Sequence, residues 1–368
     1  MIFDFLIIGG GIAGASAAYE LADHGTVLLL EAEDVTGYHS TGRSAALFTR
    51  NFGGPVVRQV NAASEPFFRS PPTGFCDSPL LTPRGSLTVA SPGHEDVLDD
   101  LLALSEPGEE ITLMDPKEAS AMVPFLRPER VTRAVFEANV TDIDVATLHL
   151  GFINGAKSRG AVVMTKQPVI ALLHQLGAWR VTTAKDSFAG AMIINAAGAW
   201  ADQIGTMAGA RNIGLVPKRR TGIIFNAPDG IPCAGLPAVD FAGFDAYIKP
   251  DAGRLMASPG DATPMEPHDV WADDMDIAVL VDWIERETRI KIARIQRSWA
   301  GLRSFVADEA PVVGFDAEMP GFFWLAGQGG YGIMMAPALA VLAAELCMNE
   351  ISTPSSLFAN KLSPLRLV

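Results

Sequence analysis

The chain has 368 residues with a formal net charge of -14, and 49% of them are hydrophobic. This length and apolar content are ample for large buried cores, which excludes a disordered chain, and the acidity argues against a nucleic-acid partner. The three cysteines, Cys76, Cys233 and Cys347, are far apart and lack metal-cluster spacing, so we expect a reducing compartment and no disulfides.

The apolar N-terminus resembles a secretory signal only superficially, because it has no basic start and carries Asp4. We interpret it as a first buried strand. The longest other apolar run, residues 336–348, is too short to cross a bilayer and predicts a core helix. We therefore expect a cytoplasmic protein without stable membrane insertion.

A glycine-rich turn follows the first predicted strand. The apolar run at residues 5–8 continues into GGGIAG at 9–14, which is a G-x-G-x-x-G turn that opens a helix. We expect Gly11 to let a pyrophosphate approach the backbone and Gly14 to let the helix pack closely against the strand.

An acid completes this motif. The helix is expected to run to about His24, and a second buried strand at 26–30 ends at Glu31. At this position a carboxylate accepts hydrogen bonds from an adenosine ribose. Strand, turn, helix, strand and acid in register favour a dinucleotide site over an incidental glycine turn.

The segment at 37–46 is rich in small and hydroxyl residues and has one arginine. It predicts a loop and helix start against a flat or phosphorylated ligand, with a surface loop as the alternative. The chain is then mixed up to Thr82, and the prolines at 71, 72 and 79 indicate a crossover out of the nucleotide region. Residues 85–90 predict a strand of a different sheet.

Helices and strands continue to alternate toward the middle of the chain. Residues 95–104 predict an acidic amphipathic helix, and Asp115 with Pro116 predicts a helix start. A strand is expected at 134–138, and Asp144 caps a helix that ends near Gly160. Residues 161–165 then predict a strand that returns to the nucleotide region.

The C-terminal half contains two further small-residue turns. An apolar strand at 191–195 leads into the first, and a strand at 322–326 leads into the second, at 327–332, which opens a helix from about Ile333. Between them we expect strands at 218–225, 246–248 and 254–257 and an amphipathic helix at 277–288, followed by the segment 299–305, which carries Arg303.

Two classes of dinucleotide compete for these turns. A Rossmann domain that binds NAD would be contiguous, whereas long strand-rich insertions separate the turns at the start of the chain, near Gly198 and near Gly330. This arrangement favours FAD, a longer ligand that is held along its length.

Seven motifs together carry a family resemblance. They are GGGIAG at 9–14, GYHSTGRSAA at 37–46, NAAGAW at 195–200, PKRR at 217–220, YIKPD at 247–251, WAGLRSFVAD at 299–308 and GQGGYGI at 327–333. On these motifs the chain resembles the FAD-dependent D-amino-acid oxidase superfamily (DAO family), which also contains glycine and sarcosine oxidases. Within it, the chain is most similar to the D-amino-acid dehydrogenases typified by D-arginine dehydrogenase.

The resemblance implies an α/β fold with two domains. A Rossmann-type FAD-binding domain would be assembled from the discontinuous segments 1–80, 145–215 and 305–368. A substrate-binding domain, with a mixed β-sheet and flanking helices, would comprise residues 81–144 and 216–304.

The resemblance also implies the cofactor residues. We expect FAD to be bound without a covalent bond, although His39 lies in a segment that carries covalent flavin in some superfamily members. The glycines from Gly329 to Gly332 would place a helix N-terminus near the flavin pyrimidine ring, where it stabilises negative charge. The complete set is Gly9, Gly11, Ile12, Ala13, Gly14, Glu31, Ala32, His39, Ser40, Thr41, Arg43, Ser44, Ala45, Ala46, Val169, Ala197, Gly198, Trp200, Gly329, Gly330, Tyr331, Gly332 and Ile333.

Arg220, Tyr247 and Arg303 match the family's substrate-carboxylate anchors and are our candidate catalytic residues. A zwitterion bound beside an apolar ring needs a guanidinium partner, and a phenol can add one hydrogen bond. For each of the three, a structural role is the alternative. Lys218 and Arg220 should share a strand face, with Arg219 pointing the other way.

The predicted substrate pocket departs from D-arginine dehydrogenase at four positions. Leu47, Phe52, Ser86 and Met334 replace a histidine, a tyrosine, an acid and a glutamine, and Gly330 completes the pocket. A buried cationic side chain would lack a counter-ion there, so we expect D-arginine and D-lysine to be poor substrates. The changes also remove groups that could bind the amine or handle a proton.

The leading hypothesis is an FAD-dependent enzyme that oxidises the C-N bond of a D-amino or secondary amino acid with an uncharged side chain. Hydride transfer to flavin N5 would give an imine, which hydrolyses to a 2-oxo acid. Oxidation of a 2-hydroxy acid is one alternative, and a flavoprotein subunit or flavin-binding protein without independent catalysis is another. The electron acceptor is open among a quinone, an electron-transfer protein and O2. The histidines make no metal-binding pattern, so we propose no metal site.

Overall fold

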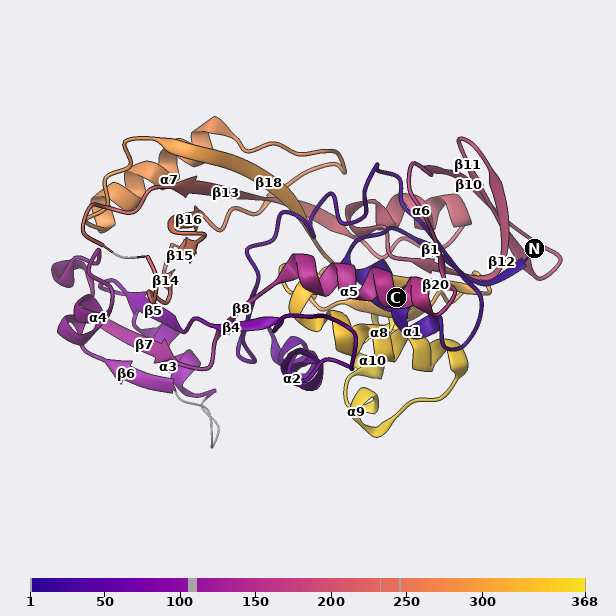
Figure 1. The fold of residues 1–368 in the computed structure, drawn as a ribbon, viewed down its shortest axis with the longest axis horizontal. Coiled ribbons are helices and arrows are strands. Elements are labelled where there is room, and N and C mark those ends of the chain that lie inside the picture. The colour runs from indigo at the N-terminus through magenta and orange to yellow at the C-terminus, as the bar shows by residue number, and fades with distance from the viewer. Residues whose placement is uncertain (1, 105–110, 232, 245, 368) are drawn as a thin grey trace.

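The computed structural model of the chain describes residues 2–104, 111–231, 233–244 and 246–367. Figure 1 shows two lobes, and both ends of the chain lie in the same lobe. Two long strands, β13 (Val216–Phe225) and β18 (Ile295–Phe305), extend from the other lobe toward it.

The first sheet forms the centre of the lobe that holds the termini. In the described part of the chain it has eight strands, in the order β10-β11-β12-β1-β2-β9, with β20 beside β12 and β19 beside β20. The strands are β1 (Ile2–Ile8), β2 (Val27–Leu30), β9 (Val162–Met164), β10 (Val169–Gln175), β11 (Ala178–Thr183), β12 (Ser187–Asn195), β19 (Val312–Phe315) and β20 (Phe322–Ala326). The central strands β20, β12, β1, β2 and β9 are parallel.

Both faces of the first sheet are covered, which explains why its central strands are almost uniformly apolar. Helices α1 (Ile12–Leu21), α5 (Val145–Ser158) and α8 (Gly332–Met348) pack on one face, and α2 (Pro55–Arg69) packs against α8. Helix α6 (Ala201–Ala208) and the β10–β11 hairpin contribute to the core on the other face.

The second sheet dominates the other lobe. It contains nine strands of the described residues, in the order β17-β13-β16-β15-β14-β5-β7-β6, with β18 beside β13. Its remaining strands are β5 (Ser86–Ala90), β6 (Ile111–Met114), β7 (Arg133–Glu137), β14 (Ala238–Ala242), β15 (Tyr247–Asp251), β16 (Arg254–Ser258) and β17 (Thr263–Pro264). Helices α4 (Pro116–Met122) and α7 (Asp274–Glu287) cover one face. Helix α3 (Asp96–Leu102) packs on β5 and β7 from the opposite face.

A small sheet of β3 (Leu47–Phe48), β8 (Thr141–Ile143) and β4 (Leu81–Pro83) lies between the lobes. The remaining elements are α9 (Thr353–Ser356), α10 (Ala359–Leu362), η1 (Pro128–Arg130), η2 (Gly198–Trp200) and η3 (Pro364–Leu367). Within the described ranges, no helix combines the length and apolarity that crossing a bilayer requires.

The predicted α/β fold class is confirmed, and most predicted elements form within a few residues of their expected bounds. The cap predictions hold as well: the Asp115 carboxylate accepts hydrogen bonds from the backbone N-H groups of Lys117 and Glu118, and that of Asp144 accepts one from Thr147. The division into two discontinuous domains stays a prediction, and its outer ends, Met1 and Val368, lie outside the described residues.

Two predicted helices differ from the structure. The first helix ends at Leu21 rather than His24, because the chain turns back to pair Thr26 with Asp4. Segment 37–46 starts no helix. Its hydroxyls instead bond other parts of the chain, since Ser40 donates to the Leu302 carbonyl and Thr41 accepts from the Ile12 N-H.

Several elements were missed, including α2, the β10–β11 hairpin, β6, β14 and β19. Helix α2 lies in the segment that we interpreted as mixed, and its Pro55 occupies the first helical position, where proline is tolerated. The β10–β11 hairpin turns at Leu176 and Gly177, which both have positive φ angles of 53° and 77°. A leucine in that conformation gives no turn signal in a sequence.

Candidate functional site

The glycine turn joins β1 to α1 with almost no space between them. A Cβ atom built at Gly14 would lie 1.9 Å from the Gly9 carbonyl oxygen, so only glycine permits this helix to approach the strand. Gly9 has a φ of 107°, which allows the tight turn. At Gly11 a Cβ would meet only the Thr41 hydroxyl, at 3.3 Å, so the backbone is open to a ligand here.

Glu31 follows β2 and lies beside this turn. One carboxylate oxygen accepts a 2.8 Å hydrogen bond from the Gly10 N-H, and the other accepts a 2.9 Å bond from the Glu33 N-H. Two backbone donors therefore fix the orientation of a carboxylate that is only 8% exposed. Its remaining lone pairs can accept hydrogen bonds from ribose hydroxyls.

His149, from α5, contacts the backbone of the glycine turn. Its Nε2 lies 2.9 Å from the Gly10 carbonyl oxygen, and burial lowers its pKa. A neutral imidazole that donates from Nε2 satisfies this carbonyl and fixes the loop. We had assigned His149 no role, because only the fold brings it to the turn.

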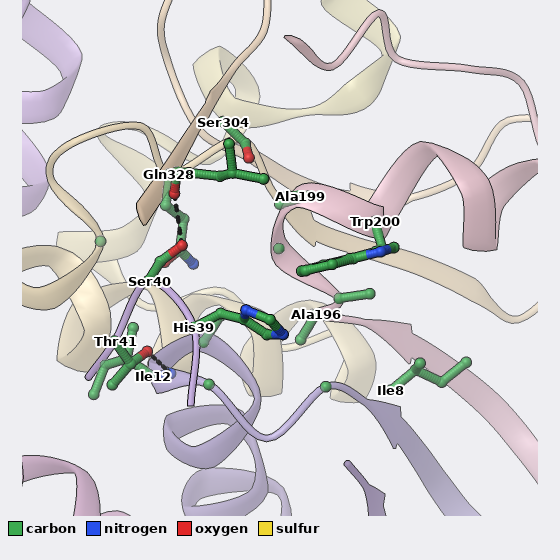
Figure 2. A pocket seen from close by; sticks show the side chains of 18 of the residues that line it. Ile8, Ile12, His39, Ser40, Thr41, Ala196, Ala199, Trp200, Ser304 and Gln328 are labelled. Atoms are coloured by element: carbon green, nitrogen blue, oxygen red, sulfur yellow. Dashed lines mark hydrogen bonds between the residues drawn. The ribbon is translucent and has the colours of Figure 1, made fainter. Parts of the chain in front are cut away.

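A cavity of about 390 Å³ runs along the carboxyl ends of the first-sheet strands. Figure 2 shows the turn near Ile12, the ring of His39, and Trp200 and Gln328 around it. Most predicted cofactor residues line this cavity, namely Gly9, Gly11, Ile12, Ala13, Glu31, Ala32, His39, Ser40, Thr41, Ser44, Val169, Ala197, Gly198, Trp200, Gly329, Gly330, Gly332 and Ile333. Such a volume is typical of small-molecule and cofactor sites.

Five predicted cofactor residues do not line the cavity: Gly14, Arg43, Ala45, Ala46 and Tyr331. For Gly14 the reason is its contact with the strand. The guanidinium of Arg43 points elsewhere, because it pairs with the Asp269 carboxylate and donates to the carbonyls of Val270 and Ala300.

Several lining residues were missed by the sequence reasoning. Gln167, Gln203 and Met207 come from segments where no motif marks them, and Ser304 lies within the quoted motif at 299–308 without having been assigned a role. Gln328 lies within the quoted glycine motif, and its buried side-chain Nε2 has no hydrogen-bond partner among the described residues. An unpaired buried donor costs free energy, so it indicates a ligand acceptor at this position.

His39 lies in the cavity wall between polar and aromatic neighbours. Its Nε2 is 2.9 Å from a Glu33 carboxylate oxygen, and its ring centroid is 4.6 Å from that of Trp200. These contacts fix the ring at one edge of the cavity (Figure 2).

Arg220, Arg303 and Tyr247 lie on the face of the second sheet that is opposite to α7. Ile223, Ala257 and Ile248 pair in register and are buried with α7 residues on one face, so Arg220 and Tyr247 lie on the opposite face. Arg303 pairs in register with Lys218, and Lys218 alternates with Arg219. Lys218 and Arg220 therefore share one face, as predicted, and Arg303 lies on the same face.

The charges on the two faces are partnered differently. Arg219, on the α7 face, lies within ion-pair distance of Asp261, Asp273 and Asp276. In contrast, no described carboxylate lies within 4.0 Å of the guanidinium of Arg220 or Arg303. Arg220 donates to the Asp261 carbonyl, and Arg303 donates to the carbonyls of Arg43 and Leu302.

The surroundings of Arg303 suit it for binding an anion. Burial lowers its pKa, and the neighbouring Arg220 lowers it further. Burial also raises the pKa of Tyr247, so this phenol remains a hydrogen-bond donor beside the two arginines. A bound carboxylate would relieve the repulsion between the guanidinium groups.

The residues predicted for the substrate pocket are not all together. Gly330 lines the cavity together with Arg303, whereas Arg220 and Tyr247 do not line it. Ser86 is buried on β5, in the second sheet, and Met334 is buried in the core of the first lobe. Leu47 is half-buried, and Phe52 is 52% exposed with its ring centroid 5.4 Å from that of Tyr331.

Comparisons with known proteins agree with this geometry. The chain is 25% identical to human dimethylglycine dehydrogenase over 90% of its own length, but spans only 41% of that protein. It is 23% identical to Geobacillus kaustophilus glycine oxidase, covering 94% of the chain and 92% of the relative. The crystal structure of L-proline dehydrogenase from P. horikoshii has the same fold, with a TM-score of 0.83, 23% identity and coverage of 99% and 97%. Residues 4–346 match the DAO family of FAD dependent oxidoreductases, so the chain belongs to this family and is an enzyme with FAD as its cofactor.

Proposed function

We propose that the chain oxidises the C-N bond of an amino acid, and that the substrate is a D-amino acid or a secondary amino acid. The observation that carries the proposal is the pair Arg220 and Arg303, two neighbouring guanidinium groups without a described carboxylate in ion-pair distance. Two such cations on one sheet face favour binding of a carboxylate. The names of the glycine oxidase and proline dehydrogenase relatives agree with a carboxylate that belongs to an amino acid.

The described residues fit FAD along the cavity. Glu31 can bind the ribose, the open backbone at Gly11 can approach the pyrophosphate, and the unpaired Gln328 Nε2 can donate to the flavin. When bound, the isoalloxazine ring supplies the hydride acceptor for the substrate Cα. We expect FAD to be held without a covalent bond.

In this proposal the residues of the second sheet orient the substrate. Arg303 and Arg220 bind its carboxylate, and the phenol of Tyr247 donates an additional hydrogen bond. Hydride transfer requires an unprotonated amine, and Leu47 and Phe52 supply no group that could accept its proton. The imine product leaves the site and is hydrolysed to a 2-oxo acid.

Asp240, which no sequence motif marks, changes the expectation for the substrate side chain. We expected an uncharged substrate because Ser86 occupies the position of an acid. In the structure, however, the Ser86 hydroxyl donates a 2.9 Å hydrogen bond to the Asp240 carboxylate, so an acid does lie at this place.

Anaerobic bleaching of the flavin by a panel of amino acids and 2-hydroxy acids tests the proposal. We expect amino acids of one configuration, or secondary amino acids, to bleach the bound FAD. Bleaching by 2-hydroxy acids alone would instead support the hydroxy-acid alternative. If no member of either class bleaches it, the chain is a flavin-binding protein or a subunit that lacks independent catalysis.

Adding O2, a quinone or an electron-transfer protein to the reduced enzyme then identifies the acceptor. Fast reoxidation by O2 would make the enzyme an oxidase. Reoxidation by a quinone or a protein alone would make it a dehydrogenase. The cytoplasmic location stays a prediction.

A further inference from the structure

Asp240 is a carboxylate on the same sheet face as the proposed carboxylate anchors. It lies directly opposite Tyr247 in the β14–β15 ladder, and directly opposite residues of a ladder project to the same side. Tyr247 lies close enough to Arg220, Arg303 and Asp240 for all three charges to influence its pKa. In the strand order β15 lies between β14, which carries Asp240, and β13 and β18, which carry the two arginines, so Tyr247 lies between this acid and the two cations across the sheet.

No Lys, Arg or His of the described residues lies within 4.0 Å of Asp240 to form an ion pair. The partner that the structure gives it is the Ser86 hydroxyl, which donates to one carboxylate oxygen at 2.9 Å. Asp240 is nevertheless only half-buried, although β14 is an interior strand of the sheet. Its carboxylate thus keeps unused acceptor capacity.

A second carboxylate reinforces this end of the sheet face. Glu137 lies directly opposite Ser86 in the β5–β7 ladder, so its side chain projects to the same side, and it accepts a 2.6 Å hydrogen bond from the Asn51 side chain. The face therefore changes from acidic at Glu137 and Asp240 to basic at Arg220 and Arg303, with Tyr247 between them.

We propose that Asp240, oriented by Ser86, is a specificity-determining residue that binds a hydrogen-bond donor on the substrate side chain, distal to the carboxylate bound by Arg220 and Arg303. This inference rests on the proposed function, because the arginines fix which end of the substrate meets Asp240. It selects amino acids with a side-chain ammonium or hydroxyl over those with an apolar group of the same size.

The environment of Asp240 agrees with this role. Burial raises its pKa, while the hydrogen bond from Ser86 lowers it. A desolvated carboxylate gains most from a charged donor, so an ammonium should be preferred to a hydroxyl. An apolar side chain would desolvate the acid further without giving it a partner.

The test compares substrates that differ in one distal group. Ornithine and norleucine have side chains of equal length that end in an ammonium or a methyl group, and homoserine and norvaline differ as hydroxyl and methyl. Each is assayed in both configurations, on enzyme normalised to bound FAD. We expect kcat/KM for ornithine to exceed that for norleucine by at least about tenfold, and a smaller ratio for homoserine over norvaline.

Two variants test whether the preference for ornithine depends on the Asp240 carboxylate. Asp240→Asn keeps the shape but removes the charge, and should reduce the ornithine to norleucine ratio by at least about tenfold, because ornithine loses its charged partner while norleucine no longer desolvates a charge. Ser86→Ala removes the orienting hydrogen bond and should reduce the ratio less. If one variant fails to retain FAD, the other still tests the assignment.

The possible failures are distinguishable. A ratio of one or less in the unaltered enzyme, or an equal ratio in the variants that retain FAD, would overturn the role of Asp240 while leaving amino acid oxidation intact. No oxidation of any of the four amino acids, together with no bleaching by the wider panel, would overturn the proposed function itself.

Discussion

The two ends of the site are built in different ways. At the nucleotide end, the phosphate-binding turn is formed by the backbone of one short stretch, in which Gly9, Gly11 and Gly14 set the path of the chain and Glu31 follows. At the substrate end, the working groups are side chains from several strands of the second sheet, and Asp240 and Ser86 are 154 residues apart in sequence.

This difference determines what a substitution does. A change at the nucleotide end alters the space between a strand and a helix, so it should affect cofactor binding and folding together. A change on the sheet face alters one charge or hydrogen bond above an intact core, so it should affect kinetics while leaving FAD in place.

Gly14→Val should have the largest effect on the nucleotide end. The added Cβ would lie 1.9 Å from the Gly9 carbonyl oxygen. Such overpacking typically lowers the free energy of unfolding by about 1–3 kcal/mol, and occasionally by more. We expect a variant with little bound FAD and a strongly lowered melting temperature. Gly54→Ala is the matched control, because a Cβ there meets nothing within 4 Å. Normal FAD content in Gly14→Val would show that the helix can move away from the strand.

Glu31→Gln should have an intermediate effect on the turn and on cofactor binding, because the amide can accept only one of the two backbone hydrogen bonds that the carboxylate accepts. The hydrogen bonds that a carboxylate accepts from ribose hydroxyls are worth about 1.5–3 kcal/mol, so the Kd for FAD should rise roughly tenfold to a hundredfold. Titration of the apoprotein with FAD measures this change. Asp34→Asn serves as the control, since that exposed carboxylate pairs with Lys166 and does not line the cavity. An unchanged Kd in Glu31→Gln would exclude Glu31 as the ribose ligand.

Tyr247→Phe should have the smallest effect, on the substrate side alone. One neutral hydrogen bond contributes about 0.5–1.5 kcal/mol, so kcat/KM should fall about threefold to tenfold with FAD content unchanged. Because burial raises the pKa of Tyr247 above its usual value of 10.0, the phenol stays protonated and donating below that pH. The loss should therefore be the same at every pH from about 7 to 9.5. A loss that disappears toward alkaline pH would mean that Tyr247 ionises in this range.

The nucleotide end could be predicted from the sequence because its information is local. Turn, helix start and acid lie within residues 9–31, where each glycine follows from the geometry of a single strand-turn-helix unit. The alternation of Lys218, Arg219 and Arg220 was also predictable, since it needs only the two-residue period of a strand.

Other parts of the site depend on pairings that no local pattern specifies. Asp240 reaches Ser86 because β14 lies next to β5, and this neighbour relation is a property of the whole sheet. His149 supports the Gly10 carbonyl only because α5 packs beneath the turn. Arg43 belonged to a recognised motif, yet its side chain turns toward Asp269, a residue 226 positions later.

The central claim is that the unpartnered arginines of the second sheet bind the substrate carboxylate, and Arg303→Met tests it most directly. Arg219→Met is its matched control, because Arg219 lies on the opposite face among three carboxylates. With kcat/KM expressed per bound FAD, we expect Arg303→Met to lose at least about a hundredfold, since removing one partner of a buried charge pair costs about 3–5 kcal/mol. Arg219→Met should lower the melting temperature and retain most of its kcat/KM. Unchanged kcat/KM per bound FAD in Arg303→Met would contradict the account.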